Sequence, residues 1–366
     1  MNKKLIILLI IVLGSLATVS WVNYFTSSDG YQMTLGPKEN VSIAITGDVM
    51  FARKMPGILG SVSSPFNNVE NITKNVDLLL INFENPTTTS DIAYKGTVPL
   101  KADPSYTHFA KDNPNTIAAL ANNHIFDYGE IGLNDTLKSL NDNGIKSIGA
   151  GNNKEEATKP IVEEINGRKI VVLNYMDQDN FKEYSQSELP QATSSNETTN
   201  GSHSGYAAID WNIVKKDIDA NKEDADIVIV YLHYGNEYSR SPNQHQEEIS
   251  RKFIDYGADI VVGSHTHVTE GVEIYKGKPI FYNLGNFIFD QSNPDTHRAM
   301  FLELNLIDDI CEVTVHPIYI NNYLPEFMGA NSGKELLNEL VPNDSAMNIT
   351  SDGKGKLTFQ LGDSKE

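Results

Sequence analysis

Residues Ile260-Val-Val-Gly263-Ser264-His265-Thr266-His267 place two histidines directly after a short apolar run. The β-branched residues predict a buried strand, and the spacing of the histidines lets both imidazoles leave the next loop toward one space. Two neutral imidazoles in that arrangement can bind a metal ion. Taken alone, however, the stretch indicates only a strand with polar side chains at its end.

Four other apolar runs end in the same way. Each is rich in strand-forming residues and finishes in side chains of the metal-binding type. Ligands gather at the carboxyl ends of strands in α/β sheets. The five strand ends therefore predict one site built from distant segments. The four further runs are 43–48, 78–84, 119–124 and 227–233, which end in Asp48, Glu84, Asn122-Asn123-His124 and His233.

Strand-like and helix-like segments alternate from Val41 onward. This alternation favours layered α/β packing, in which helices lie against sheets. A polar stretch rich in Ser, Thr and Asn at 184–204 predicts a loop near the site or an insertion. The predicted strands are 41–46, 77–83, 116–121, 145–148, 169–174, 227–231, 260–262, 279–283 and 300–306, and the predicted helices lie near 69–74, 107–112, 131–143 and 334–340.

The composition excludes several classes of protein and site. A chain of 366 residues holds one large domain or two moderate ones. The net charge of −19 argues against a nucleic-acid partner, because nucleic acids require a basic surface. Such a surface also repels a polyanionic substrate unless a local positive centre, such as a bound metal, is present. Because Cys311 is the single cysteine, any metal must be held by nitrogen and oxygen ligands.

The N-terminus predicts a membrane anchor. Lys3 and Lys4 precede an apolar run at 5–22, which is close to the ~20 residues that cross a bilayer. Basic residues before such a run favour a cytoplasmic N-terminus. We therefore expect a single-pass anchor at 1–25, a spacer at 26–40, an extracytoplasmic domain at 41–325 and a polar C-terminal tail at 326–366. A cleaved signal peptide is the alternative, although Ala17-Thr-Val-Ser20 fits a cleavage site poorly.

Each polar strand end also has a plainer explanation. Asp48, after a glycine that permits a tight turn, is by itself better explained as a cap of that turn. Glu84, followed by Pro86, fits a bridging carboxylate and a solvent-facing turn residue equally well. His233 alone is more often a hydrogen-bonded histidine at a sheet edge. Only the combination favours a metal centre.

The stretch Asn122-Asn123-His124-Ile-Phe-Asp127 adds a candidate catalytic pair. An Asn side-chain oxygen can serve as a neutral ligand, and the neighbouring His124 can protonate a leaving group. Asp127 can orient that imidazole by accepting its other N–H. The alternative is a helix entry capped by the two asparagines. Histidines without a strand-end position are interpreted as ordinary surface or loop residues; these are His108, His203, His245, His297 and His316.

Six segments in this order resemble the capsule-synthesis CapA/PgsA family of poly-γ-glutamate production, whose domain looks like a calcineurin-type metallophosphoesterase. The resemblance spans roughly 41–290 and implies a layered α/β–β, metallophosphoesterase-like sandwich behind the N-terminal transmembrane helix. The segments are Gly47-Asp48-Val-Met50, Asn82-Phe-Glu84-Asn-Pro86, Asn122-Asn123-His124-Ile-Phe-Asp127-Tyr-Gly129, His233-Tyr-Gly235-Asn-Glu237, Gly263-Ser-His265-Thr-His267 and Asn283-Leu-Gly285-Asn286-Phe287, the last interpreted as a structural turn near the site.

The phosphoesterase pattern implies a two-cation site with Glu84 as the bridging ligand. Met50 stands where that pattern has a histidine, and a thioether is a poor ligand for a hard cation. One cation position therefore loses a ligand, and one or two ions of Mn, Zn or Fe are expected. The ligands implied by the resemblance are Asp48, Glu84, Asn123, His233, His265 and His267, with His124 as the proton donor.

The expected function is a membrane-anchored component of poly-γ-glutamate synthesis, transfer or export. Its expected partners are the acidic polymer and membrane synthase subunits, and its chemistry concerns γ-glutamyl amide or phosphoester bonds. Two alternatives stay open, an extracytoplasmic phosphoesterase and a non-catalytic scaffold that binds the polymer. Basic residues near the motifs, Arg53 among them, could clamp substrate carboxylates, although most such residues are solvated surface side chains.

Overall fold

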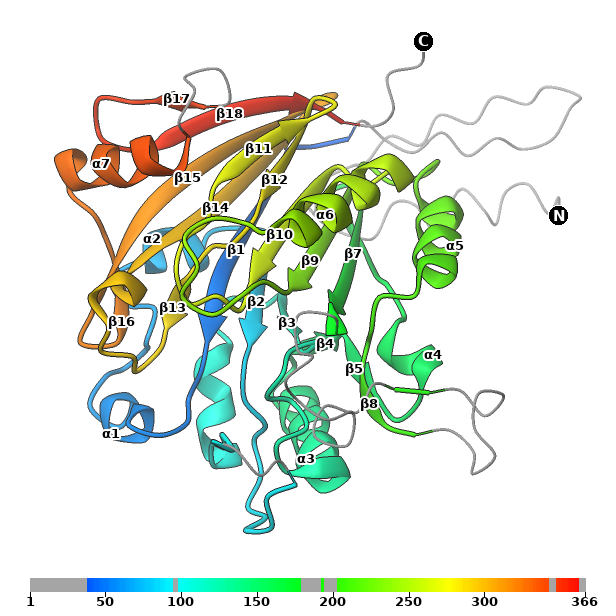
Figure 1. Ribbon diagram of the computed structural model, residues 1–366, viewed down its shortest axis with the longest axis vertical. Helices are drawn as coiled ribbons and strands as arrows, with labels where there is room; N and C mark the ends of the chain where they lie inside the picture. Colours follow the sequence, from blue (N-terminus) through cyan, green and yellow to red (C-terminus); the bar gives the residue numbers. More distant parts are fainter. Residues whose placement is uncertain (1–37, 95–97, 179–191, 194–202, 342–346, 362–366) are drawn as a thin grey trace, which may run out of the picture.

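Two sheets form the frame of the molecule in the computed structural model, which describes residues 38–94, 98–178, 192–193, 203–341 and 347–361 (Figure 1). In these residues the larger sheet has the order β17-β18-β15-β14-β1-β2-β3-β4, with β13 beside β1 and β16 beside β15. Its strands are β1 (Val41–Val49), β2 (Leu78–Phe83), β3 (Thr116–Ala119), β4 (Lys146–Ile148), β13 (Asn286–Ile288), β14 (Arg298–Ile307), β15 (Ile310–Asn321), β16 (Leu324–Phe327), β17 (Asn348–Ile349) and β18 (Gly355–Gln360).

The second sheet has the order β11-β12-β10-β9-β7-β6, and β5 pairs with β8 in a separate small ladder. Its central strands β7, β9, β10 and β12 run parallel, as do β1 to β4 in the larger sheet. The strands are β5 (Ala150–Gly151), β6 (Ile161–Ile165), β7 (Arg168–Met176), β8 (Gly205–Tyr206), β9 (Ile227–His233), β10 (Ile260–Ser264), β11 (Val272–Tyr275) and β12 (Lys278–Phe281).

The two sheets pack face to face. Their shared core contains Ile45 and Leu80 from one sheet and Tyr231 and Val262 from the other. The Tyr231 hydroxyl donates a hydrogen bond to the backbone oxygen of Thr46 and so ties the sheets together. Strands β2 and β9 are buried along their whole length, which explains their continuous apolar sequences.

Helices cover the outer faces of the sheets, except that α7 buries Leu336, Leu337 and Leu340 in the core between them. Phe253 of α6 stacks on Tyr175 of β7, with ring centroids 5.9 Å apart, and Leu133 of α3 joins the core outside β2. This arrangement confirms the predicted layered α/β packing. The helices are α1 (Met55–Leu59), α2 (Glu70–Thr73), α3 (Gly129–Asp142), α4 (Lys154–Ala157), α5 (Trp211–Asn221), α6 (Gln244–Tyr256) and α7 (Ala330–Leu340), with 3-10 turns at Pro104–Ala110 and Pro294–His297.

The predicted polar tail at 326–366 is wrong for its described residues. The chain continues from β16 into α7, and β18 pairs antiparallel with β15 inside the larger sheet. Leu357 and Phe359 are buried, whereas the alternating residues Lys356, Thr358 and Gln360 are exposed. Half of this strand is therefore polar, and so the sequence looks like a tail although it folds as sheet.

The predicted anchor at 1–25 lies outside the described residues, as do residues 26–37 of the spacer and most of the predicted loop at 184–204. Among the described helices, none is both long and apolar enough to cross a bilayer. At the edge of the loop, Thr193 forms an isolated β-bridge with His203.

Candidate metal centre

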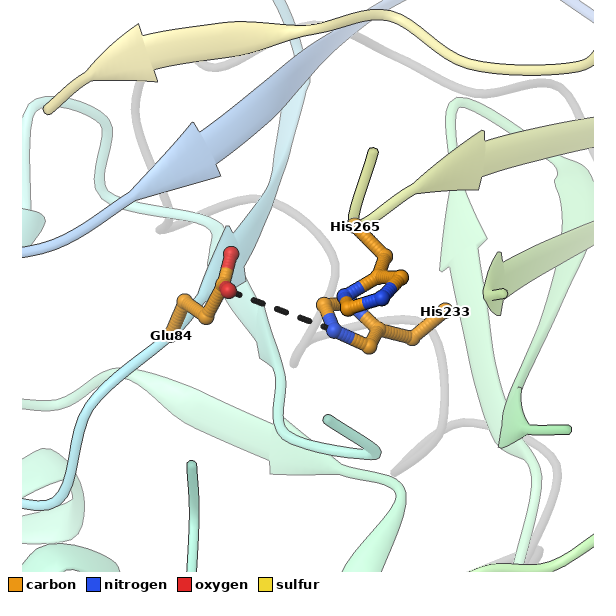
Figure 2. A group of neighbouring side chains, drawn as sticks. All are labelled: Glu84, His233 and His265. Atoms are coloured by element: carbon orange, nitrogen blue, oxygen red, sulfur yellow. Dashed lines mark ion pairs between the residues drawn. The ribbon is translucent and has the colours of Figure 1, made fainter. Parts of the chain in front are cut away.

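The parallel strands of both sheets bring their carboxyl ends to one place. In the larger sheet Asp48 is in register with Asn82 on one side and with Asn286 on the other. In the second sheet Ser264 is in register with His233. Figure 2 shows Glu84, just past the end of β2, facing imidazoles that belong to the second sheet. The site therefore forms where the two sheets meet.

Local backbone features set these side chains in place. A Cβ atom on Gly47 would lie 1.8 Å from the backbone oxygen of Gly285, so only glycine allows β1 to approach this turn. The glycine thus serves a close approach within a strand, not the tight turn that the sequence predicts. His265 and His267 have φ values of 103° and 62°. Left-handed backbone costs a non-glycine residue about 1–2 kcal/mol, and such strain concentrates at functional sites.

Glu84 belongs to two groups of candidate ligands. One group is Glu84, His233 and His265, and the other is Asp48, Glu84 and His267; within each group the ligand atoms all lie within 4.8 Å of one another. Nε2 of His233 lies 4.0 Å from Oε1 of Glu84, and Nδ1 of His267 lies 3.4 Å from Oδ2 of Asp48. This geometry suits two adjacent cations with a shared carboxylate.

The predicted ligand Asn123 lies beside the first group. Its Oδ1 is 3.0 Å from Nε2 of His233, so the amide oxygen and the imidazole nitrogen face the same point. The structure therefore brings together all six residues that the resemblance implies as ligands. They are buried, each with less than a twentieth of its surface exposed: Asp48, Glu84, Asn123, His233, His265 and His267.

The electrostatics of the centre favour a cation. Oδ2 of Asp48 and Oε1 of Glu84 are buried, and neither accepts a hydrogen bond from any described residue. Burial raises the pKa of Glu84 well above its ordinary value, the neighbouring Asp48 raises it further, and Arg53 partly offsets this. Two adjacent buried carboxyl groups are costly unless a positive charge compensates them. A divalent cation bound here would supply that charge.

Asn82 is a site residue that the sequence interpretation did not single out. Its Nδ2 donates to Oδ1 of Asp48 at 2.8 Å and to Oε2 of Glu84 at 3.2 Å, and so links the two carboxylates. A neighbouring amide, that of Asn122, donates to the backbone oxygen of Phe83. The available signal was an amide inside the otherwise apolar run of β2.

His124 and Asp127 form the predicted pair. Nδ1 of His124 lies 2.7 Å from Oδ2 of Asp127, whose carboxylate also accepts from the backbone N–H of Leu100 at 2.7 Å. The carboxylate favours the tautomer protonated at Nδ1, so that Nε2 takes up and releases the second proton. The His124 side chain is 12% exposed, whereas that of Asp127 is buried.

Met50 and Asn286 differ in their relation to the centre. The buried sulfur of Met50 accepts from the backbone N–H of Ala52, which gives it a structural role. Asn286 begins a short strand beside Asp48, and its Oδ1 lies 3.0 Å from Nδ1 of His267. The predicted position of this segment near the site is confirmed.

Two histidines set aside from the sequence have defined partners. His316 is buried in β15, a strand that was not predicted, and its Nε2 lies 2.9 Å from Oε2 of Glu303. Its interpretation as a surface residue is therefore wrong. This contact lowers the pKa of Glu303. His245, at the start of α6, lies 3.0 Å from the buried carboxylate of Asp177.

Comparison with solved structures gives only weak similarities. A hypothetical protein from Thermus thermophilus aligns with 87% of this chain and 99% of its own, at 12% identity and a TM-score of 0.43. A similarity at that level carries no conclusion about fold or activity.

Comparison with known sequences gives a clear family. The PGA biosynthesis protein CapA of Bacillus subtilis (strain 168) is 32% identical over 88% of this chain and 82% of its own length. The capsule biosynthesis protein CapA of Bacillus anthracis is 31% identical over 74% of this chain and 65% of its own. A probable polyglutamine synthesis accessory protein of Mycobacterium tuberculosis is 28% identical over 52% of this chain and 50% of its own length. Residues 42–291 match the model of the family described as bacterial capsule synthesis protein PGA_cap. The resemblance inferred from the motifs is thereby confirmed, and the chain belongs to the PGA_cap family.

Proposed function

We propose that this protein is a membrane-anchored, extracytoplasmic component of poly-γ-glutamate synthesis, transfer or export that acts through a divalent-metal, hydrolase-like centre. The observation that carries the chemistry is the pair of buried ligand groups that share Glu84. The names of the relatives support the polymer context. The apolar run at 5–22, preceded by lysines, supports the anchor and the external position of the domain.

The donor set fits a divalent cation. Carboxylate, imidazole and amide groups suit Mn, Zn or Fe, and the set contains no thiolate. The two buried carboxylate oxygens without a hydrogen bond, on Asp48 and Glu84, are the atoms that a cation would satisfy. His233, His265 and His267 would complete its coordination from the second sheet. This orphaned pair of oxygens is the reason for preferring a metal centre over a purely structural cluster.

The reaction we infer is hydrolysis or transfer at a γ-glutamyl amide. A bound divalent cation supplies a water of lowered pKa and polarises the electrophile. His124 gives its Nε2 proton to the departing nitrogen as the carbon–nitrogen bond breaks, and Asp127 holds the imidazolium in place. The Arg53 guanidinium forms an ion pair with the buried carboxylate of Asp290. Its side chain is 36% exposed, so its remaining N–H groups can hold a substrate carboxylate near the centre. The same parts would act on a phosphoester.

Metal content tests the proposal first. The purified full chain and a His265→Ala/His267→Ala variant are incubated with Mn, Zn or Fe, dialysed and subjected to elemental analysis. We expect one to two equivalents in the wild type and none in the variant, with unchanged circular dichroism. A wild-type protein that stays metal-free with every ion would overturn the hydrolase-like centre and leave a polymer-binding scaffold.

Substrate assays then separate the remaining roles. Cleavage of synthetic γ-glutamyl oligomers that depends on His124 supports the proposal. Activity confined to an aryl phosphate or phosphodiester would indicate an extracytoplasmic phosphoesterase instead. The protein is a non-catalytic scaffold if cells with the Glu84→Ala variant export normal polymer while cells whose protein lacks residues 1–25 export none.

A further inference from the structure

The second group of candidate ligands is one member short. Asp48, Glu84 and His267 supply three donors, and Met50 stands where the phosphoesterase pattern supplies a fourth. Its sulfur accepts a hydrogen bond from the backbone N–H of Ala52 at 2.8 Å and is buried. The missing ligand must therefore come from elsewhere if this group is to hold a cation as firmly as the first.

Asn286 offers an oxygen beside the second group. Its Oδ1 lies 3.0 Å from Nδ1 of His267, the nitrogen that is also 3.4 Å from Oδ2 of Asp48. Strand β13, which Asn286 begins, runs parallel to β1 with Asn286 in register with Asp48. The pairing is irregular just after Asp48, and such bulges commonly re-aim side chains next to active sites.

Hydrogen bonds fix which end of the Asn286 amide faces the centre. Its Nδ2 donates to Oε1 of Gln291 at 2.9 Å and to the backbone oxygen of Thr296 at 3.2 Å. Both hydrogens of the amide nitrogen are thereby used. An inverted amide would place its oxygen against two acceptors. The carbonyl oxygen of Asn286 is therefore held toward His267 and Asp48.

The first group contains the same arrangement. There Oδ1 of Asn123 lies 3.0 Å from Nε2 of His233, and that nitrogen is 4.0 Å from a carboxylate oxygen of Glu84. Each group thus pairs an imidazole nitrogen with an amide oxygen at 3.0 Å beside a buried carboxylate oxygen without a hydrogen bond. Asn286 is the counterpart of Asn123 in the second group.

We propose that Asn286 would be the fourth protein ligand of a second divalent cation, beside Asp48, Glu84 and His267. The inference rests on the proposed metal centre and goes beyond it in fixing the number of cations. Each position then has four protein ligands of the nitrogen and oxygen type.

Manganese titration of the full chain tests this assignment. Bound Mn is counted by elemental analysis, and electron paramagnetic resonance distinguishes an exchange-coupled pair from a single ion. We expect two equivalents and a coupled signal in the wild type. Asn286→Ala should bind one equivalent firmly and the second about 10–100-fold more weakly, as is typical when a group that supports a metal is removed. Asn286→Asp keeps an oxygen ligand and should retain the coupled pair.

Asn283→Ser is the matched control. Asn283 lies in the same turn, where its Oδ1 accepts from the backbone N–H of Gly285 at 3.0 Å, and serine keeps an acceptor there. This control should bind two equivalents. Equal thermal unfolding of all variants in EDTA shows that each has folded.

The outcomes separate this inference from the proposed function. A wild type that binds no Mn refutes both, whereas one equivalent lost in the His265→Ala/His267→Ala variant refutes only the second position. Two equivalents with unchanged affinity in Asn286→Ala also refute the role of Asn286. The anomalous signal of Mn-loaded crystals shows whether Asn286 binds the cation or only accepts a hydrogen bond from His267. An anomalous peak about 2.2 Å from Oδ1 supports the inference, whereas Oδ1 still bonded to His267 and away from the peak overturns it.

Discussion

Replacing Glu84 by glutamine should change the stability of this protein in opposite directions with and without metal. The Glu84 carboxyl is fully buried beside Asp48, and its Oε1 accepts no hydrogen bond from the described residues. In the metal-free protein this group opposes folding. In the loaded protein it is the shared ligand of both candidate groups. The isosteric glutamine amide removes the charge and can donate to Asp48 without leaving a cavity.

The sign of the metal-free effect follows from the raised pKa of Glu84. The unfolded chain releases this proton near pH 4.5, whereas the folded chain retains it to higher pH. The folded state therefore binds more protons above pH 4.5, and stability falls as pH rises. A buried unsatisfied polar group costs about 1–3 kcal/mol. In EDTA at about pH 8, Glu84→Gln should unfold roughly 1–4 °C above the wild type, because an unfolding entropy of about 2.1 cal/mol/K per residue makes 1 kcal/mol correspond to about 1.3 °C for 366 residues.

Manganese should reverse the order. A ligand present at about 100 times its dissociation constant stabilises the folded state by about 2.7 kcal/mol, and only the wild type should gain this. The assay is thermal unfolding by circular dichroism of both proteins in EDTA and in saturating Mn. Asn283→Ser serves as a control for damage near the site. Our account of the centre is wrong if Glu84→Gln is the less stable protein in EDTA, or if Mn stabilises both proteins equally.

Three further outcomes test separate parts of the molecule. His124→Ala should lower turnover by about 10²–10⁴-fold, the usual contribution of a general acid, while bound Mn measured by elemental analysis stays unchanged; a parallel loss of Mn would make His124 a ligand. Burial raises the pKa of Glu270 to about 8, so between about pH 4.5 and 8 the folded state keeps a proton that the unfolded chain loses, and stability falls as pH rises. Glu270→Gln should therefore flatten the fall in unfolding temperature over this pH range, measured in saturating Mn. An unchanged slope contradicts this. Arg53→Lys should raise KM for γ-glutamyl oligomers by up to about tenfold at constant kcat, because lysine lacks the paired donors of arginine. The control Arg298→Lys, which alters a salt bridge to Glu339, should leave KM unchanged. Equal KM values in the two variants would show that Arg53 does not bind substrate.

Strands buried on both faces are the part of this fold that sequence predicts well. The runs that form β2 and β9 are apolar throughout because parallel central strands have no solvent face. Strand β18 shows the opposite case. Its two large apolar side chains, Leu357 and Phe359, are both buried but are separated by the polar Thr358, so its sequence lacks a continuous apolar run. Its partner β15 also lies far earlier in the chain. Pairing over such a separation cannot be inferred from local composition.

The candidate ligands were predictable for a related reason. Parallel strands in one sheet end at one edge, so Asp48 and Glu84 had to lie near each other once both were assigned to strand ends. The contribution of Asn286 was not predictable in the same way. Its role depends on which end of an amide faces His267, and Gln291 and Thr296 decide that through contacts outside the motif. Sequence gives the residue type at a strand end, whereas tertiary hydrogen bonds give its orientation.

The charge of the chain limits how an acidic polymer could be recognised. At a net charge of −19 the average surface repels a polyanion, so many weak contacts spread over that surface would not hold it. Attraction would then have to be local and of short range. In the proposed function a cation at the buried centre would supply it together with Arg53, whose guanidinium lies 5.2 Å from the ring of Phe289, which in turn contacts His267. At 0.1 M salt the repulsion between exposed charges more than about 10 Å apart is largely screened, whereas buried pairs are screened much less. Under the proposed function, such a centre would select one carboxylate or one chain end at a time, which is what cutting or transferring a polymer requires and what merely coating it does not.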